Sequence, residues 1–296
     1  MKHKSHRLAT IALIGFGMIA ASSASAQGFT LFGDPSPKPP AEQKTVRPLT
    51  APYFHEDSFV TTDIRPWFVD HHFYSDTIGG DAQVYAVQFR LAVTSQLQLV
   101  VYKGGYLDFN DTMNDEGGWN DHAIGLKWAF IQDWENQFHM AAGVGYQFPI
   151  GDSDILQDTE EIRLWLSANK GFGRLHLGAT LNYRIAGSHN DGNLGSSDMI
   201  TAHLHADYFV NEWFSPVVEI NGYFVTDEGP GTMPFSGVDA ASIAGGKNED
   251  TVTGAIGAEF RPFGPDLGIR GAYETQLTDN QSLFGHRWTI SAVYEF

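Results

Sequence analysis

The chain has 296 residues, lacks cysteine and carries a formal net charge of −17 at pH 7. Without cysteine it has no disulfide framework, no thiolate chemistry and no thiolate metal site. The acidic balance leaves no basic field for nucleic acid, which is therefore excluded as a partner.

Residues 1–26 have the layout of a secretory signal peptide. Three basic residues lie within the first seven positions, an apolar stretch covers 8–21, and Ala24-Ser25-Ala26 forms an A-x-A cleavage site. We therefore expect export and cleavage after Ala26. Losing three positive charges would take the net charge from −17 to −20.

The next segment, residues 27–58, is rich in proline and poor in apolar content. Six of the thirteen prolines fall between Asp34 and Pro52. This composition favours an extended, solvated backbone. The prediction is a periplasmic lead-in, with a plug in the barrel or a partner-binding arm as the alternatives.

From about Thr61 onward, apolar and polar residues alternate in segments of roughly ten to fourteen residues, which is typical of membrane strands. One such apolar face consists of Tyr85, Val87, Phe89, Leu91 and Val93. Helical periodicity is nowhere sustained, and a chain without membrane helices can span a bilayer only as a closed barrel. The pattern predicts an all-β fold over residues 59–296, namely a closed antiparallel transmembrane β-barrel of about twelve strands.

The connections between these segments alternate between short and long. The short ones lie at 94–96, 132–136, 169–173, 210–212 and 262–265, and the long ones at 71–80, 108–121, 149–159, 186–197, 227–249 and 277–285. This rhythm indicates short periplasmic turns and long outer loops. A soluble all-β protein, which also buries one face of each strand, is the alternative.

The last eleven residues alternate strictly. One face carries Trp288, Ile290, Ala292, Tyr294 and Phe296. This ending resembles the C-terminal targeting signal of bacterial outer-membrane β-barrels, with Tyr294 and Phe296 as its aromatic positions. The resemblance implies the cell outer membrane of a Gram-negative bacterium, with the barrel-assembly machinery, membrane lipid and lipopolysaccharide as partners.

Charged residues of the predicted strands fall on the face opposite to the apolar one. The cations are Arg65, Arg90, Lys127, Arg163, Arg184, Arg261, Arg270 and Arg287, and the main carboxylates are Glu161, Asp207, Glu219, Glu259 and Glu274. Arginine facing lipid at mid-membrane would cost about 2–4 kcal/mol, so these residues must face the lumen. They would form either a lumen packed with ion pairs or a water-filled pore whose charges set selectivity.

His203, His205 and Asp207 alternate on one predicted strand and share its inner side. Two histidines at this spacing are a weak candidate for a metal site, and a polar lumen network is the favoured interpretation. The acidic outer loops match no EF-hand spacing. No metal site and no cofactor is therefore predicted.

Four short motifs carry a family resemblance. Gly118-Trp119-Asn120-Asp121, Gly125-Leu126-Lys127-Trp128, Gly143-Val144-Gly145 and Pro149-Ile150-Gly151-Asp152 resemble a pattern in the "MetA-pathway of phenol degradation" family of outer-membrane transport barrels. Ile150 stands where threonine is usual. The resemblance implies an exported barrel that moves small organic molecules, and it brings no catalytic residues.

The sequence contains neither a G-x-S-x-G nor an S-x-x-K motif, so we do not expect an enzyme. The functional hypothesis is a porin-like channel for passive uptake or efflux of small polar or organic solutes. The alternatives are a barrel enzyme that modifies outer-membrane lipid and a closed structural or adhesive barrel.

Overall fold

A computed structural model of the protein describes residues 28–75, 79–112, 115–155, 159–187, 197–227, 250–278 and 285–296. The predicted signal peptide, residues 1–26, lies outside the described residues, as does most of the predicted 227–249 connection. Neither of the two short 3-10 helices in these ranges is long and apolar enough to cross a membrane.

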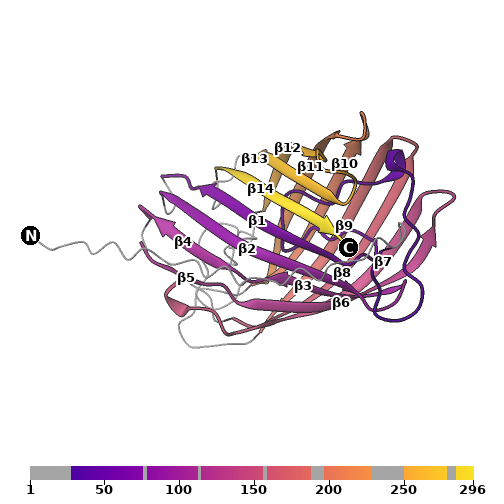
Figure 1. The fold of residues 1–296 in the computed structure, drawn as a ribbon. Helices are drawn as coiled ribbons and strands as arrows, with labels where there is room; N and C mark the ends of the chain where they lie inside the picture. Colours follow the sequence, from indigo (N-terminus) through magenta and orange to yellow (C-terminus); the bar gives the residue numbers. More distant parts are fainter. Residues whose placement is uncertain are drawn as a thin grey trace, which may run out of the picture.

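The regular secondary structure of the described residues is almost entirely β-strand (Figure 1). The strands are β1 (Asp63–His72), β2 (Asp81–Ala92), β3 (Leu97–Lys103), β4 (Tyr106–Asn110), β5 (Gly117–Trp119), β6 (His122–Asp133), β7 (Phe138–Phe148), β8 (Glu161–Phe172), β9 (Leu175–Ala186), β10 (Asp198–Tyr208), β11 (Phe214–Asp227), β12 (Thr251–Phe260), β13 (Leu267–Gln276) and β14 (His286–Glu295). The 3-10 helices are η1 (Ala41–Gln43) and η2 (Ser153–Ile155).

These strands form one closed antiparallel barrel. β1 pairs with β14 on one side and with β2 on the other, which closes the sheet. β3 and β4 are separated by Gly104 and Gly105, and both pair with β2. On their other side, β3 pairs with β6 and β4 pairs with β5, so β5 and β6 form the next interrupted row. Counting each interrupted row once gives twelve strands, so the predicted fold is confirmed.

The break between β3 and β4 has a local cause. Gly105 has a φ of 111°, which L side chains rarely adopt. A Cβ there would also lie 2.8 Å from the Cα of Ala86 on β2. Glycine therefore lets the interrupted strand stay close to β2.

Alternation along each strand separates the two faces of the barrel. On β9, Leu177 and Leu181 are 40% and 53% exposed on the outside, whereas Thr180 and Asn182 are buried inside. An apolar exterior around an interior rich in polar and charged side chains is typical of a transmembrane barrel, although the interior also contains an apolar cluster that includes Trp67 and Val69.

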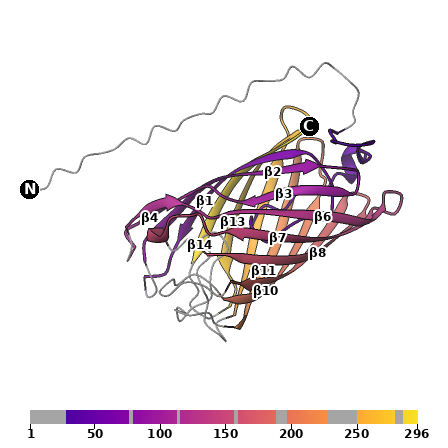
Figure 2. The same ribbon diagram turned by 90° about the horizontal axis from the view of Figure 1, so that it is seen from below.

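The two ends of the barrel differ. Turns 93–96, 134–137, 173–174, 209–213 and 261–266 join strands at one end, here called the short-turn end, and the longer connections lie at the other, the long-loop end. The predicted alternation is therefore present. The C-terminus and η1 both lie at the short-turn end (Figure 2).

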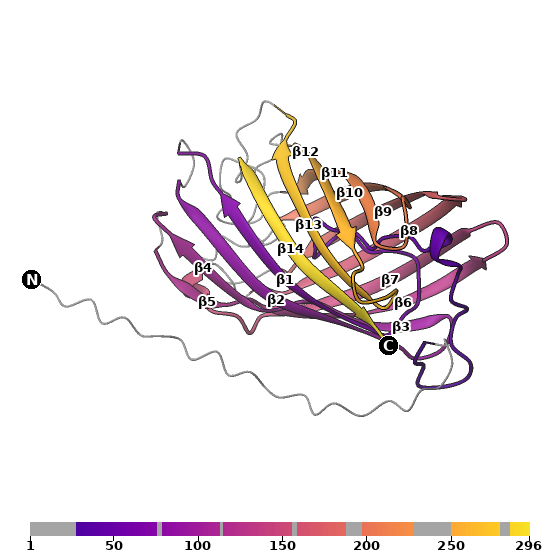
Figure 3. The ribbon, with the colours of Figure 1, turned by 45° about the horizontal axis from the view of Figure 1, so that its top comes forward.

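A segment of the polypeptide backbone lies in the lumen, in addition to the side chains of the strands. Every residue from Thr45 to Val60 is buried, and this stretch, the lumen segment, runs inside the ring of strands (Figure 3). The sequence predicted a periplasmic lead-in over 27–58, with a plug in the barrel as one alternative, and residues 45–58 occupy the position of that alternative. Their peptide groups and charges find partners on the barrel wall, so this part has no need of solvent.

One close contact inside the wall can be tested. Gly143 on β7 faces Trp165 on β8, and a Cβ at Gly143 would overlap the indole ring. We expect Gly143→Val to lower the free energy of unfolding by about 1–3 kcal/mol, because overpacking displaces buried side chains. Urea unfolding in detergent micelles measures it. The matched control is Gly271→Val on β13, where the nearest atom to a Cβ is 3.9 Å away. An equal loss in both variants would contradict this account.

Candidate functional site

The lumen segment enters and leaves at the short-turn end. Lys44, just before it, is 2.9 Å from Glu295 near the end of β14. At its far side, the Thr61 carbonyl accepts a hydrogen bond from Gln98 near the start of β3. The segment is therefore a re-entrant loop, and its turn at Ala51–Phe54 is the part deepest in the barrel.

The tip of this loop is held by Arg163 on β8. Its guanidinium donates to the carbonyl oxygens of Tyr53 and Phe54, the latter at 2.9 Å. The same group lies over the rings of Tyr102 and Trp165, 4.8 Å from each centroid. A cation between aromatic faces is attracted to both, so Arg163 fixes the tip in place.

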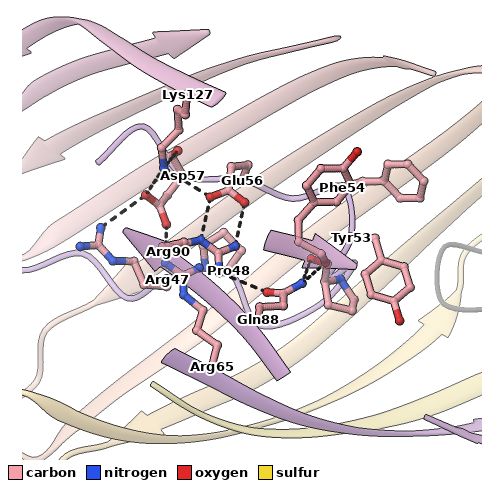
Figure 4. A network of polar contacts seen from close by, with 12 residues as sticks. Arg47, Pro48, Tyr53, Phe54, Glu56, Asp57, Arg65, Gln88, Arg90 and Lys127 are labelled. Carbon is pink, nitrogen blue, oxygen red and sulfur yellow. Dashed lines mark hydrogen bonds and ion pairs between the residues drawn. The ribbon is translucent and has the colours of Figure 1, made fainter. Parts of the chain in front are cut away.

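Two adjacent carboxylates on the returning limb meet the cations of the wall (Figure 4). Glu56 receives the Arg90 guanidinium at 2.7 Å and the Lys127 ammonium at 3.3 Å. Asp57 lies 3.2 Å from Arg65 and 3.4 Å from Lys127. Both carboxylates, and the cations that they pair with, are almost fully buried.

These contacts set the charge balance of the lumen. Placing a charge in a low-dielectric interior costs several kcal/mol per ion unless partners compensate for the lost water. Arg65, Arg90 and Lys127 come from the wall, and much of their compensation comes from Glu56 and Asp57 of the lumen segment. The wall and the segment are therefore electrostatically complementary.

The entering limb is held through its backbone amides. Asp207 on β10 accepts a hydrogen bond from the N–H of Val46 at 3.2 Å. Glu219 on β11 accepts from the N–H groups of Leu49 and Thr50 at 2.8 and 2.7 Å. Carboxylates therefore satisfy peptide groups that lie too deep in the barrel to reach bulk water.

Histidines connect these two carboxylates. His205 Nδ1 lies 2.7 Å from Glu219 and its Nε2 lies 3.0 Å from Asp207. An ionised carboxylate only accepts, so with Glu219 and Asp207 both ionised this geometry places a proton on each ring nitrogen of His205. His176 adds a 2.7 Å contact to the other oxygen of Asp207.

The weak metal candidate, His203 with His205, has its nitrogens engaged elsewhere. His203 contacts Asn221 and Thr201 at 2.8 Å each, and His205 contacts the two carboxylates. No group of three or more histidine or acidic residues suited to a metal ion occurs among the described residues. In this structure the pair forms part of the polar network.

The predicted lumen residues lie where alternation placed them. Arg65, Arg90, Lys127, Arg163, Arg184, Arg270, Arg287, Glu161, Asp207, Glu219, Glu259 and Glu274 are all buried within the barrel. Some form ion pairs between neighbouring strands of the wall: Arg287 lies 2.6 Å from Glu274 and Arg184 lies 3.6 Å from Glu161. Arg261 differs, because it follows β12 in a short turn, where it pairs with Glu259. Their part in solute selectivity stays a prediction.

The aromatic residues of the C-terminal strand lie on its outer face. Tyr294 and Phe296 are 43% and 53% exposed, and their rings meet edge to face with centroids 5.0 Å apart. The Phe296 oxygen also accepts a hydrogen bond from the N–H of Phe29 at 3.1 Å. Their role as a targeting signal stays a prediction.

Two motifs of the family resemblance, 118–121 and 149–152, lie together at the long-loop end, and the other two, 125–128 and 143–145, lie within β6 and β7. Asp121 accepts hydrogen bonds from the N–H groups of Ile150 and Gly151 at 3.1 and 2.8 Å. Asp152 accepts one from Trp119 at 2.6 Å. These aspartates tie the break between β5 and β6 to the loop after β7, which is a structural role.

A cavity of about 800 Å³ lies at the short-turn end, next to the two ends of the lumen segment. Its lining includes the proline-rich stretch 35–40, both limbs of the segment at Arg47 and Phe59, and the turn residues Trp213 and Pro265. The cavity gives the base of the segment room on the side from which the chain enters.

Sequence reasoning missed Arg47, Glu56 and Asp57, because the whole segment was assigned to a solvated linker. A usable signal was present: Tyr53, Phe54 and Phe59 are aromatic, and solvated linkers are poor in aromatic residues. The combination of aromatic rings and paired charges is typical of a buried segment.

No family model matches the chain, and no curated protein matches its sequence. The fold is similar to that of an outer membrane channel from Pseudomonas putida F1, with 14% identity and a TM-score of 0.59 over 85% of this chain and 100% of that one. A KdgM porin matches over 80% of this chain and 99% of its own, with 9% identity and a TM-score of 0.47. The transport unit of the autotransporter AIDA-I from Escherichia coli matches over 81% and 91%, with 12% identity and a TM-score of 0.44. At these identities the likeness concerns the fold alone.

The ion pairs of the lumen segment lead to a stability prediction. Glu56→Gln removes one partner from a buried pair, so we expect the free energy of unfolding to fall by about 3–5 kcal/mol. The control is Asp266→Asn, which breaks a half-exposed pair with Lys38 and should cost about 0–1 kcal/mol. Urea unfolding of both variants in micelles measures the difference, and equal losses would rule out a special role for Glu56.

The histidine geometry leads to a spectroscopic prediction. Nitrogen-15 shifts of selectively labelled protein at pH 7 should show protons on both ring nitrogens of His205, because each faces a carboxylate. His203 is the internal reference, since its ring nitrogens contact the neutral side chains of Asn221 and Thr201. A neutral His205 ring would show that the carboxylates do not share its protons.

Proposed function

We propose that this protein is an outer-membrane channel for small polar or organic solutes, and that the lumen segment, residues 45–60, closes it in the conformation described. Conduction then requires this segment to shift. The short-turn end faces the periplasm and the long-loop end faces outward, as is usual for barrels of this class. Assembly proceeds through the C-terminal strand with Tyr294 and Phe296, in contact with lipid and lipopolysaccharide.

One observation carries the proposal: polar and ionic contacts hold the segment along much of its length. Glu56, Asp57 and the amides of Leu49 and Thr50 all meet charged side chains of the wall. Such contacts can be exchanged for water when the segment moves, whereas an apolar core offers no comparable substitute. The fold shared with a Pseudomonas putida outer membrane channel supports the same function.

The filled lumen also favours a second candidate, a closed structural or adhesive barrel that works through its outer loops. The two candidates differ in whether the lumen segment moves out of the lumen: it does so in the channel and does not in the closed barrel. A barrel enzyme acting on membrane lipid has no comparable observation in its favour.

An engineered disulfide distinguishes the two candidates. The amide of Asn221 donates to the Thr50 hydroxyl at 2.9 Å, and the chain has no cysteine of its own. We expect the Thr50→Cys, Asn221→Cys double variant to conduct in a planar bilayer after reduction and to fall silent after oxidation, because the bond fixes the segment near its tip.

The wild-type protein, treated with the same oxidant and reductant, is the control and should not respond. Conductance that is equal in both redox states, with the disulfide confirmed by mass, would contradict a moving segment. Silence in both states, from inserted protein, would favour the closed structural barrel.

A further inference from the structure

A row of polar side chains crosses the closure of the barrel on its outer face. At the long-loop end, His72 on β1 pairs directly with His286 on β14 and, on its other side, with Asp81 on β2. Directly paired residues of neighbouring strands point to the same face of a sheet. The His72 and Asp81 side chains are 54% and 46% exposed, so this face is the outer one.

The contacts within the row are close. Nδ1 of His72 lies 2.5 Å from a carboxylate oxygen of Asp81. The rings of His72 and His286 have centroids 4.8 Å apart and planes tilted by 31°. Asp81 therefore orients the first imidazole, and the second lies beside it.

This arrangement has the chemistry of a metal site. When Nδ1–H of a histidine donates to a carboxylate, Nε2 keeps its lone pair and becomes a stronger ligand. A metal ion lies about 2.0–2.1 Å from an imidazole nitrogen, so two rings bound at a tetrahedral angle have centres about 5 Å apart. The observed separation of 4.8 Å fits that value.

We propose that His72 and His286 bind a divalent transition metal ion of the kind that prefers imidazole, such as Zn²⁺ or Cu²⁺, with Asp81 as a positioning residue. Imidazole nitrogen favours these ions over Ca²⁺ and Mg²⁺, which take oxygen ligands. Water completes the coordination, because the described residues offer no third histidine or acidic ligand there.

The surroundings leave room for such water. A surface hollow of about 460 Å³ is lined by both histidines together with Phe73, Tyr74, Thr275 and Gly285. The site would be open and exchangeable. It would also join the first strand to the last, and so brace the one place where the barrel closes.

The experiment titrates Zn²⁺ alone into the mature full-length protein in micelles, purified without a histidine tag and followed by calorimetry. We expect one ion per chain, and loss of that binding in both His72→Ala and His286→Ala. Asp81→Asn should weaken affinity by about 10–100-fold, the usual effect of losing a carboxylate behind a ligand. The control is His122→Ala, an exposed histidine on β6 that should leave binding unchanged.

A second measurement separates specific binding from effects on folding. Zn²⁺ should raise the temperature at which the wild-type barrel loses its compact form on electrophoresis, since an ion that binds only the folded state stabilises it. His286→Ala should keep the wild-type transition without metal and show no rise with it. The proposal is overturned if wild-type protein binds no ion, or if the His72 and His286 variants bind as wild type does.

Discussion

The structure depends on one constraint: every charge inside the barrel must have a partner, because few of them can reach bulk water. The wall strands carry buried cations such as Arg65, Arg90 and Lys127. Glu56 and Asp57 of the lumen segment form ion pairs with them. Removing the segment would take these carboxylates from Arg90 and Lys127 unless water entered, whereas Arg65 would keep its 2.6 Å pair with Asp63 on β1. The segment is thus part of the interior.

The same constraint links structure to function. In the proposed channel, water takes over the ion pairs and the amide–carboxylate hydrogen bonds of the two limbs when the segment withdraws, and the apolar contacts of Tyr53 and Phe54 at the tip are given up. Arg163 between Tyr102 and Trp165 holds the tip, and Glu219 with Asp207 holds the entering limb. The cavity at the short-turn end lies on the side from which the segment would be withdrawn.

The barrel could be predicted from the sequence because its signal is local. Period-two alternation and the rhythm of turn lengths fixed the strand number and the inward side of residues such as Arg90 and Arg184. The position of the lumen segment could not be predicted this way, because its partners are remote along the chain. The backbone N–H of Ser58 donates to Asn169, and that of Leu49 donates to Glu219. Proline content indicated a solvated linker, and only the aromatic residues Tyr53, Phe54 and Phe59 argued against it.

The most direct measurement is the labelling rate of a single cysteine in the lumen segment by a membrane-impermeant thiol reagent. Ser58 is fully buried, so Ser58→Cys in the folded barrel should react far more slowly than Glu135→Cys in an exposed short turn. Adding Glu56→Gln and Asp57→Asn should speed its labelling, because the segment loses its ionic hold. Equal rates for Ser58→Cys and Glu135→Cys would contradict a segment held inside the lumen.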